Sequence, residues 1–78
     1  MIQELLENLG LSQAESAIYL AGLELGKALP KHLAQKAKIN RSMLYKLLPN
    51  LLKQGLVSET ILGKRRYLIA EDPQNLLN

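Results

Sequence analysis

The sequence predicts one small, mainly helical α+β domain in which three core helices precede a two-stranded β-hairpin. Apolar residues recur at helical spacing through the first two thirds of the chain. After Gly55 this spacing gives way to two short runs rich in β-branched and aromatic residues, with a glycine between them. We therefore expect a single domain over residues 1–78, which is too small for an enzyme cleft with walls of its own.

The composition indicates an aliphatic core and a reducing environment. Of the 78 residues, 47% are hydrophobic, and Phe, Trp and Cys are absent. Without cysteine there can be no disulfide and no thiolate zinc site. No apolar run approaches the roughly 20 residues of a membrane span, and the N-terminus lacks the basic start of a signal peptide. We expect a soluble, cytoplasmic protein with no membrane contact.

Charge is segregated along the chain. All ten Lys and Arg residues lie between Lys27 and Arg66, where Glu59 is the only acid. The first 26 residues contain four glutamates and no basic residue. This segregation predicts one strongly basic surface, for which nucleic acid is the natural partner. The alternative is that the lysines only solvate exposed helix faces.

The first helices have recognisable boundaries. A short helical segment is expected over residues 2–9. Ser12 and Glu15 have the spacing of a capping box, in which each residue can satisfy a backbone N–H of the other, so a longer helix should begin there. Gly26 can adopt the left-handed conformation that ends this helix.

Two further helices are separated by a very short turn. Pro30 suits the first turn of a helix, and Asn40 is a favourable N-cap for the next helix, over about 41–54. The three residues at 38–40 join them, which predicts a helix-turn-helix. Pro49 falls inside the second of these helices. We expect it on the solvent face of a curved helix, where the lost backbone hydrogen bond costs least.

The end of the chain predicts a hairpin. Extended runs at 56–61 and 66–70 flank a turn at 62–65 that contains a glycine. A hairpin after a helix-turn-helix gives the winged helix arrangement, with the wing tip at 62–66. Pro73 is expected to end the hairpin, and residues 74–77 to start a helical segment.

A set of residues in matching order and spacing carries a family resemblance. They are LGLS at 9–12, Glu15, YL at 19–20, LG at 25–26, RS at 41–42, Tyr45, Leu48, Leu51, GLV at 55–57, Tyr67 and Pro73. The sequence resembles the N-terminal winged helix-turn-helix domain of the TrmB family of transcriptional regulators, typically archaeal and often sugar-responsive. Pro49 departs from the family pattern. Longer members continue into a dimerising helix and an effector-binding domain, so no small-molecule effector is supported for these 78 residues.

The candidate DNA contacts lie at the starts of the two helices of the motif and at the wing tip. In helix-turn-helix proteins the first residues of the second helix reach base edges in the major groove. Arginine can donate in pairs to guanine or phosphate, and hydroxyls and lysines suit phosphates. The predicted contacts are Pro30, Lys31, Asn40, Arg41, Ser42, Met43, Tyr45, Lys46, Lys64, Arg65 and Arg66.

Several of these residues also have a purely structural explanation. Arg41 could form a surface ion pair, Ser42 could be a hydroxyl of the first helical turn, and Tyr45 could pack against the preceding helix. Cations at the wing tip could serve to prevent edge-to-edge strand pairing. His32 is the single histidine and is interpreted as a surface residue.

These patterns favour sequence-specific double-stranded DNA binding by a transcriptional regulator that acts as a homodimer. The alternative is a winged helix that binds another protein through an apolar patch, and RNA binding through the same basic surface is a third possibility. The sequence contains no nucleophile and base pair, glycine-rich phosphate loop or acidic metal cluster. No enzyme activity, cofactor or metal site is therefore predicted.

Overall fold

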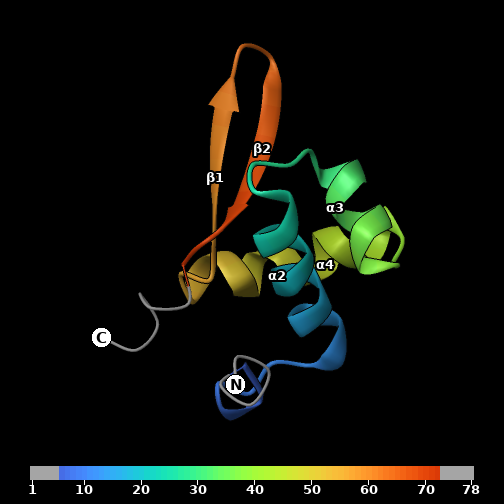
Figure 1. The fold of residues 1–78 in the computed structure, drawn as a ribbon, viewed down its shortest axis with the longest axis vertical. Helices are drawn as coiled ribbons and strands as arrows, with labels where there is room; N and C mark the ends of the chain where they lie inside the picture. The colour runs from blue at the N-terminus through green and yellow to red at the C-terminus, as the bar shows by residue number, and fades with distance from the viewer. Residues whose placement is uncertain (1–5, 73–78) are drawn as a thin grey trace.

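A computed structural model of the chain describes residues 6–72 (Figure 1). A helical turn at residues 6–8 comes first. The elements that follow are α2 (Gln13–Leu25), α3 (Pro30–Ala37), α4 (Arg41–Lys53), β1 (Val57–Leu62) and β2 (Arg65–Ala70). This order confirms the predicted winged helix arrangement. The expectations for Pro73 and for residues 74–77 lie outside the described residues.

The predicted capping box begins α2. The backbone N–H of Glu15 donates to Oγ of Ser12 over 3.1 Å, and the backbone N–H of Ser12 donates to Oε1 of Glu15 over 3.0 Å. The helix ends at Gly26, whose φ of 71° is in the range that favours glycine. Both ends of α2 therefore follow from local sequence.

The turn between α3 and α4 has the predicted length. Lys38 closes α3 in the left-handed conformation, with φ 62° and ψ 41°. A residue with a Cβ atom adopts this conformation at a cost of roughly 1 kcal/mol relative to glycine. Asn40 then caps α4, because its Oδ1 accepts the backbone N–H of Met43 over 2.8 Å.

Helix α2 lies at the centre of the fold and packs against α3, α4 and β2 (Figure 1). Tyr19 is fully buried, and its hydroxyl donates to the backbone oxygen of Glu71 over 2.6 Å. The aliphatic core around it consists of Leu6, Leu11, Ile18, Ala21, Ala28, Leu33, Ala34, Leu44, Leu48, Leu51, Leu56, Val57 and Leu68. The core side chains from α4 are leucines, so α4 is fixed to the rest of the fold by apolar burial.

The hairpin is antiparallel and has a tighter turn than the sequence predicted. Pairing runs from Val57 opposite Ala70 to Leu62 opposite Arg65, so both end residues of the predicted turn belong to strands. Only Gly63 and Lys64 remain between the strands. Gly63 has φ 65°, and Lys64 is not among the described residues with positive φ, which is the pattern of a type II′ turn.

A short extended segment before α3 supports the hairpin on its second side. The N–H of Ala28 donates to the oxygen of Leu68 over 3.0 Å, and the N–H of Leu68 donates to the oxygen of Ala28 over 2.7 Å. Nothing in the sequence between Gly26 and Pro30 has the length of a strand, so this isolated bridge was not predicted. It ties the wing to the linker between α2 and α3.

The base of the hairpin packs closely on α2. Gly22 is buried, and a Cβ atom at this position would lie 2.9 Å from Cβ of Ala70 in β2. Real Cβ atoms do not approach each other this closely, so glycine is required for the observed distance between helix and strand.

Helix α4 continues through Pro49 to Lys53, and the side chain of Pro49 is exposed. The predicted placement of the proline on the solvent face is therefore confirmed. Among the residues that the structure describes, no helix has the length and apolar character that crossing a membrane requires.

Candidate nucleic-acid interface

Helix α4 has a buried face and an exposed polar face. Leu44, Leu48 and Leu51 are buried against the core. Ser42 and Lys46 lie on the opposite side of the helix at 100° per residue, and both are exposed. The helix contains no acidic residue. Its outward face can therefore approach a polyanion without like-charge repulsion.

The first turn of α4 is open to solvent. Arg41, Ser42 and Met43 are all exposed. Asn40 is also exposed, but its Oδ1 is occupied by the cap, which leaves the Nδ2 donor for an outside partner. The structure thus gives Asn40 a role in folding in addition to its predicted contact.

A hollow between α3 and the start of α4 brings three predicted contacts together. Lys31 lies on one side, and Asn40 and Arg41 lie on the other. The remaining lining residues are Ala34, Gln35 and Ile39. Pro30, half-buried, occupies the first turn of α3 just before Lys31. Two helix N-termini and two cations therefore border the same surface, which favours anions.

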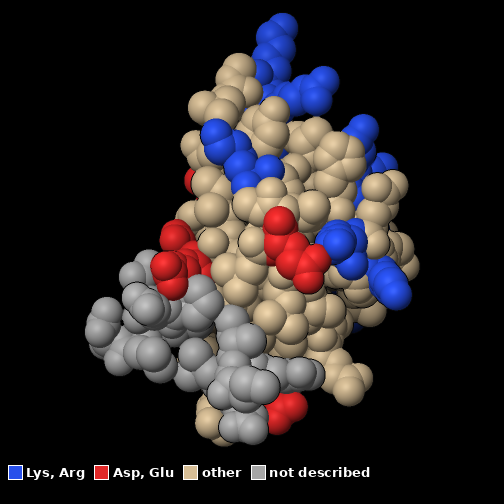
Figure 2. All heavy atoms as spheres, in the orientation of Figure 1, with Lys and Arg blue, Asp and Glu red and all other residues tan. Residues whose placement is uncertain are grey.

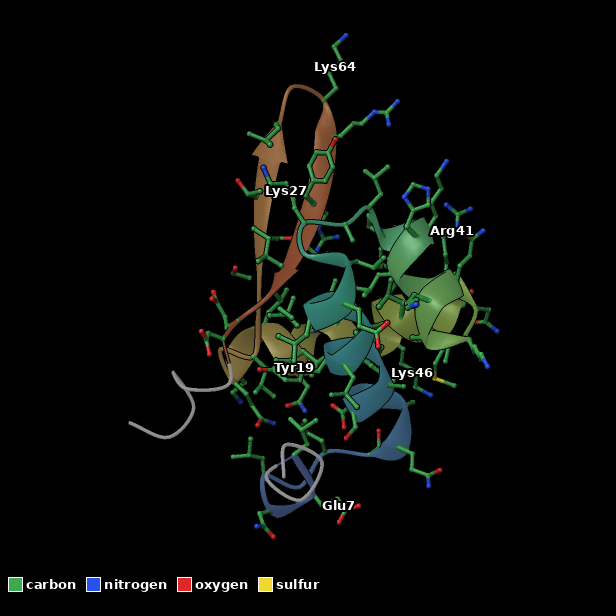
Figure 3. All side chains as sticks on the ribbon, in the orientation of Figure 1. Glu7, Tyr19, Lys27, Arg41, Lys46 and Lys64 are labelled. Atoms are coloured by element: carbon green, nitrogen blue, oxygen red, sulfur yellow. The ribbon has the colours of Figure 1, made fainter. Side chains whose placement is uncertain are left out.

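The wing carries the remaining predicted contacts. Figure 3 shows Lys64 at the tip of the hairpin and Arg41 on the side formed by α3 and the start of α4. Lys64 and Arg65 are exposed. Arg66 forms an ion pair through Nε with the carboxylate of Glu59 on the neighbouring strand. Glu59, the only acid between Lys27 and Arg66, therefore pairs with one of the three basic residues of the wing.

Two basic residues outside the predicted set lie on the same elements as the predicted contacts or next to them, Lys27 at the hairpin and Lys53 on α4. Nζ of Lys27 is 5.9 Å from the centre of the Tyr67 ring, which places a cation at the hairpin (Figure 3). Lys53 is exposed and lies seven residues after Lys46, two helical turns further along the same face. Helical spacing was the signal for Lys53. No sequence signal links Lys27 to Tyr67, because they are 40 positions apart.

On the face that Figure 2 shows, the surface charge is segregated as predicted. In Figure 2 the Lys and Arg atoms gather at the top and right of the molecule, and the Asp and Glu atoms lie mainly in its middle and lower part. One ion pair, between Lys36 and Glu24 at 2.9 Å, joins the two regions. Arg41 takes part in no ion pair within residues 6–72. Tyr45 of α4 is also open to solvent, because its exposed fraction is 45%.

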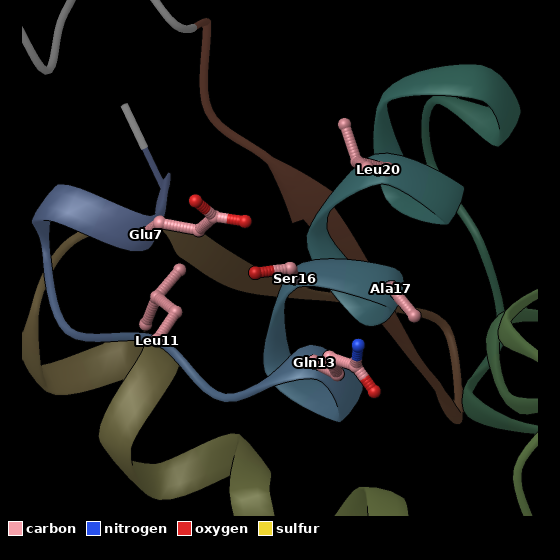
Figure 4. A pocket seen from close by; sticks show the side chains of 6 residues that line it. All are labelled: Glu7, Leu11, Gln13, Ser16, Ala17 and Leu20. Atoms are coloured by element: carbon pink, nitrogen blue, oxygen red, sulfur yellow. The ribbon is translucent and has the colours of Figure 1, made fainter. Parts of the chain in front are cut away.

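A second hollow lies away from the basic surface. It is lined by Glu7, Leu11, Gln13, Ser16, Ala17 and Leu20, from the chain before α2 and from α2 itself (Figure 4). Glu7 and Lys64 lie at opposite ends of the long axis of the molecule (Figure 3). The lining mixes apolar groups with a carboxylate, so it does not suit nucleic acid. Within the described part of the chain, no group of His, Cys, Asp or Glu side chains could hold a metal ion.

Glu15 connects α4 to the cap of α2. Its Oε2 accepts a hydrogen bond of 2.7 Å from Nδ2 of Asn50. Burial raises the pKa of Glu15, but the hydrogen bonds from Ser12 and Asn50 outweigh it and hold the pKa below the ordinary value of 4.5. The carboxylate is therefore ionised at neutral pH and fixes α4 on α2.

A helix-turn-helix with an exposed basic second helix and a β-hairpin wing defines a winged helix domain. A family model described as sugar-specific transcriptional regulator TrmB matches residues 6–73. The chain therefore belongs to the TrmB family of transcriptional regulators, whose helix-turn-helix is a DNA-binding element and which are in general not enzymes. No curated protein and no solved structure matches the chain.

Proposed function

We propose that this domain binds double-stranded operator DNA sequence-specifically, with α4 in the major groove and the wing on the phosphate backbone. One observation carries this proposal. The outward face of α4 is exposed, basic and free of acids, while the opposite face is buried as leucine in the core. A helix with this division can enter a groove without any rearrangement of the core.

The residues at the start of α4 have complementary roles in this proposal. Arg41 can donate two hydrogen bonds to the O6 and N7 atoms of one guanine. Ser42 and Tyr45 offer hydroxyls to phosphates, and Lys46 offers a point charge. Met43 and Asn40 border the same surface. This part of α4 precedes Pro49. The base contacts would therefore be made by the part of the helix whose backbone hydrogen bonds the proline does not interrupt.

Phosphate contacts from α3 and the wing would fix the orientation of α4. Lys31 follows Pro30 in the first turn of α3, where free backbone N–H groups favour a phosphate. Lys64 and Arg65 are exposed and can reach the backbone. Arg66 can do so as well, because its ion pair with Glu59 uses Nε and leaves both terminal nitrogens.

We also propose that the protein acts as a homodimer. One reading helix covers a single half-site, and paired half-sites in helix-turn-helix operators are centred about 34–36 Å apart. A dimer would contact both half-sites. The ratio of its affinities for operator and other DNA would then be about the square of the ratio for one domain.

A second candidate is a winged helix that binds another protein. The exposed fractions of Met43 and Tyr45, 40% and 45%, favour it, because they place apolar surface on α4 beside Arg41. The two functions predict different responses to salt, since phosphate contacts release counterions and apolar contacts do not.

The test is selection of a binding sequence from a random duplex library, followed by affinity measurements over a range of salt. If about five cations contact phosphates, log K against log salt has a slope near −4 or −5. A structured RNA serves as competitor. Enrichment of one sequence with this slope supports the proposal. A flat salt dependence with no enriched sequence contradicts it, and stronger binding to the RNA would assign the basic surface to RNA.

A further inference from the structure

The tip of the wing carries exposed aliphatic side chains. Ile61 has an exposed fraction of 70% and Leu62 of 49%, the two largest values among the exposed large hydrophobic residues of the described chain. Both are the last residues of β1, beyond the part of the hairpin that packs on the core. Neither side chain belongs to the core or to the partly buried residues packed against it, so core packing does not explain this exposed apolar surface.

These side chains alternate with cations. Ile61 is paired with Arg66 across the hairpin, and Leu62 is paired with Arg65. Directly opposite residues point to the same face of a sheet, so each face of the tip presents one aliphatic group beside one guanidinium. Lys64 lies in the turn between them. Glu59, the only acid between Lys27 and Arg66 in the sequence, is already paired with Arg66.

We propose that Ile61 and Leu62 form an apolar wedge that enters the minor groove of DNA and bends it, an inference that rests on the proposed function. Aliphatic side chains inserted at base steps unstack them and kink the duplex toward the major groove. The flanking cations, Lys64, Arg65 and Arg66, would hold the two phosphate backbones on either side of the wedge.

The dimensions of the hairpin require the DNA to deform. Paired strands lie about 4.8 Å apart, and the minor groove of B-form DNA is about 6 Å wide. The backbone of the tip alone nearly fills such a groove, so aliphatic side chains on both faces can enter only if the groove widens. Widening accompanies bending toward the major groove, and flexible pyrimidine–purine steps permit it at the lowest cost.

The charge pattern favours DNA over other occupants of the tip. A second wing tip would bring its own Lys64 and Arg65 against the same cations, which is repulsive. An anionic lipid surface shares the attraction for cations and aliphatic groups, but it has no groove that would require alternation on two opposite faces. Self-association and vesicle binding are therefore outcomes of the test.

The protein arm of the test separates apolar from ionic contacts. In the double variant Ile61→Thr with Leu62→Thr, threonine places at both positions a β-branched side chain that suits a strand, and it removes most of the aliphatic surface. We expect about tenfold weaker binding to the selected operator with an unchanged salt slope, because no charge is lost. The bend angle, measured by energy transfer between labelled duplex ends, should fall. The matched variant Lys64→Ala should reduce the salt slope by about one and retain the bend.

The DNA arm needs no protein variant. Replacing every adenine of the operator by 2,6-diaminopurine adds an amino group in the minor groove and leaves the major-groove edge unchanged. The parent protein should lose affinity on this DNA, and the double variant should lose much less. Unfolding midpoints of all proteins are compared in parallel, since substitutions at exposed positions should leave them within a few degrees.

Each outcome has one meaning. If the parent binds no duplex, the proposed function fails and the wedge fails with it. If the parent binds and the double variant binds and bends the operator equally well, or diaminopurine has no effect on the parent, only the wedge is wrong. The wedge is also wrong if the double variant loses self-association in ultracentrifugation, or binding to vesicles of anionic phospholipid, while DNA bending is unchanged.

Discussion

Asn50 of α4 donates a hydrogen bond of 2.7 Å to Glu15, the residue whose carboxylate also completes the N-terminal cap of α2. One oxygen of this carboxylate accepts the backbone N–H of Ser12, and the other accepts the side chain of Asn50. Asn50 directly follows Pro49, where α4 lacks a backbone donor. The hydrogen bond therefore holds the part of α4 that follows the break in its backbone hydrogen bonding.

Replacing Asn50 tests this connection. Asn50→Ala should lower the free energy of unfolding by about 1–2 kcal/mol, because a nearly buried carboxylate oxygen loses its charged hydrogen bond. Urea denaturation measures the change. Gln54→Ala is the matched control, since it removes an exposed amide from the end of the same helix and should change stability by less than about 0.5 kcal/mol. Equal effects of the two substitutions would remove Asn50 from this role.

The same carboxylate predicts a loss of stability in acid. The pKa of Glu15 in the folded protein is held below 4.5, because the hydrogen bonds from Ser12 and Asn50 outweigh the effect of burial. Its stabilising contribution is therefore complete above the unfolded pKa and is lost as the pH falls through the lower folded pKa. Urea denaturation from neutral pH to well below 4.5 measures the profile. Glu15→Gln should flatten this part of it, and an unchanged profile would assign the acid response to other carboxyl groups.

The contact between Gly22 and Ala70 gives a further prediction. Gly22→Ala adds a Cβ atom 2.9 Å from Cβ of Ala70, so helix and strand must move apart. Although alanine is the better helix former, we expect a net loss of about 1–3 kcal/mol from this overpacking. Adding Ala70→Gly removes the opposing methyl group and should restore part of the stability. A thermodynamic cycle over the four proteins measures the coupling, and simple additivity would show that the two positions do not collide.

Local features of this fold follow from the sequence, and contacts between distant segments do not. The capping box at Ser12 and Glu15 needs only a spacing of three residues. The bond from Asn50 to Glu15 spans 35 positions and depends on how α4 packs on α2. The pairing of Ala28 with Leu68 was missed for the same reason, because one residue of extended chain has no periodicity to detect.

The candidate site shows the same limit. Helical spacing was sufficient to separate the leucines of α4 from Ser42 and Lys46. It could not show that Arg66 pairs with Glu59, because that contact depends on the exact strand register. The turn is shorter than the sequence predicted, since Leu62 and Arg65 pair as strand residues. The exposure of Ile61 likewise depends on where the core ends.

Pro49 should not be needed for stability. Its side chain is exposed, and alanine would restore a donor to the carbonyl oxygen of Tyr45, so Pro49→Ala should be neutral or stabilising. Midpoints of thermal and urea unfolding measure this. A loss well above 1 kcal/mol would mean that the proline sets a bend on which the packing of α4 depends.

The last prediction separates the reading helix from the wing. Arg41 begins α4 and is exposed, so Arg41→Ala should cost roughly 1–3 kcal/mol on the selected operator and less on scrambled duplex. Arg41→Lys is the sharper variant. It keeps the charge but loses the planar fork, so discrimination should fall while binding to scrambled DNA is nearly unchanged.

Arg65→Ala should behave differently, because an exposed arginine at the wing tip meets phosphates whose positions do not depend on sequence. All duplexes should weaken by a similar factor, and the salt slope should decrease by about one unit. Affinities of the parent and the three arginine variants for operator and scrambled DNA, each over a range of salt, provide the comparison. If Arg65→Ala lost discrimination while both Arg41 variants bound like the parent, the wing would be the reading element and α4 a backbone contact.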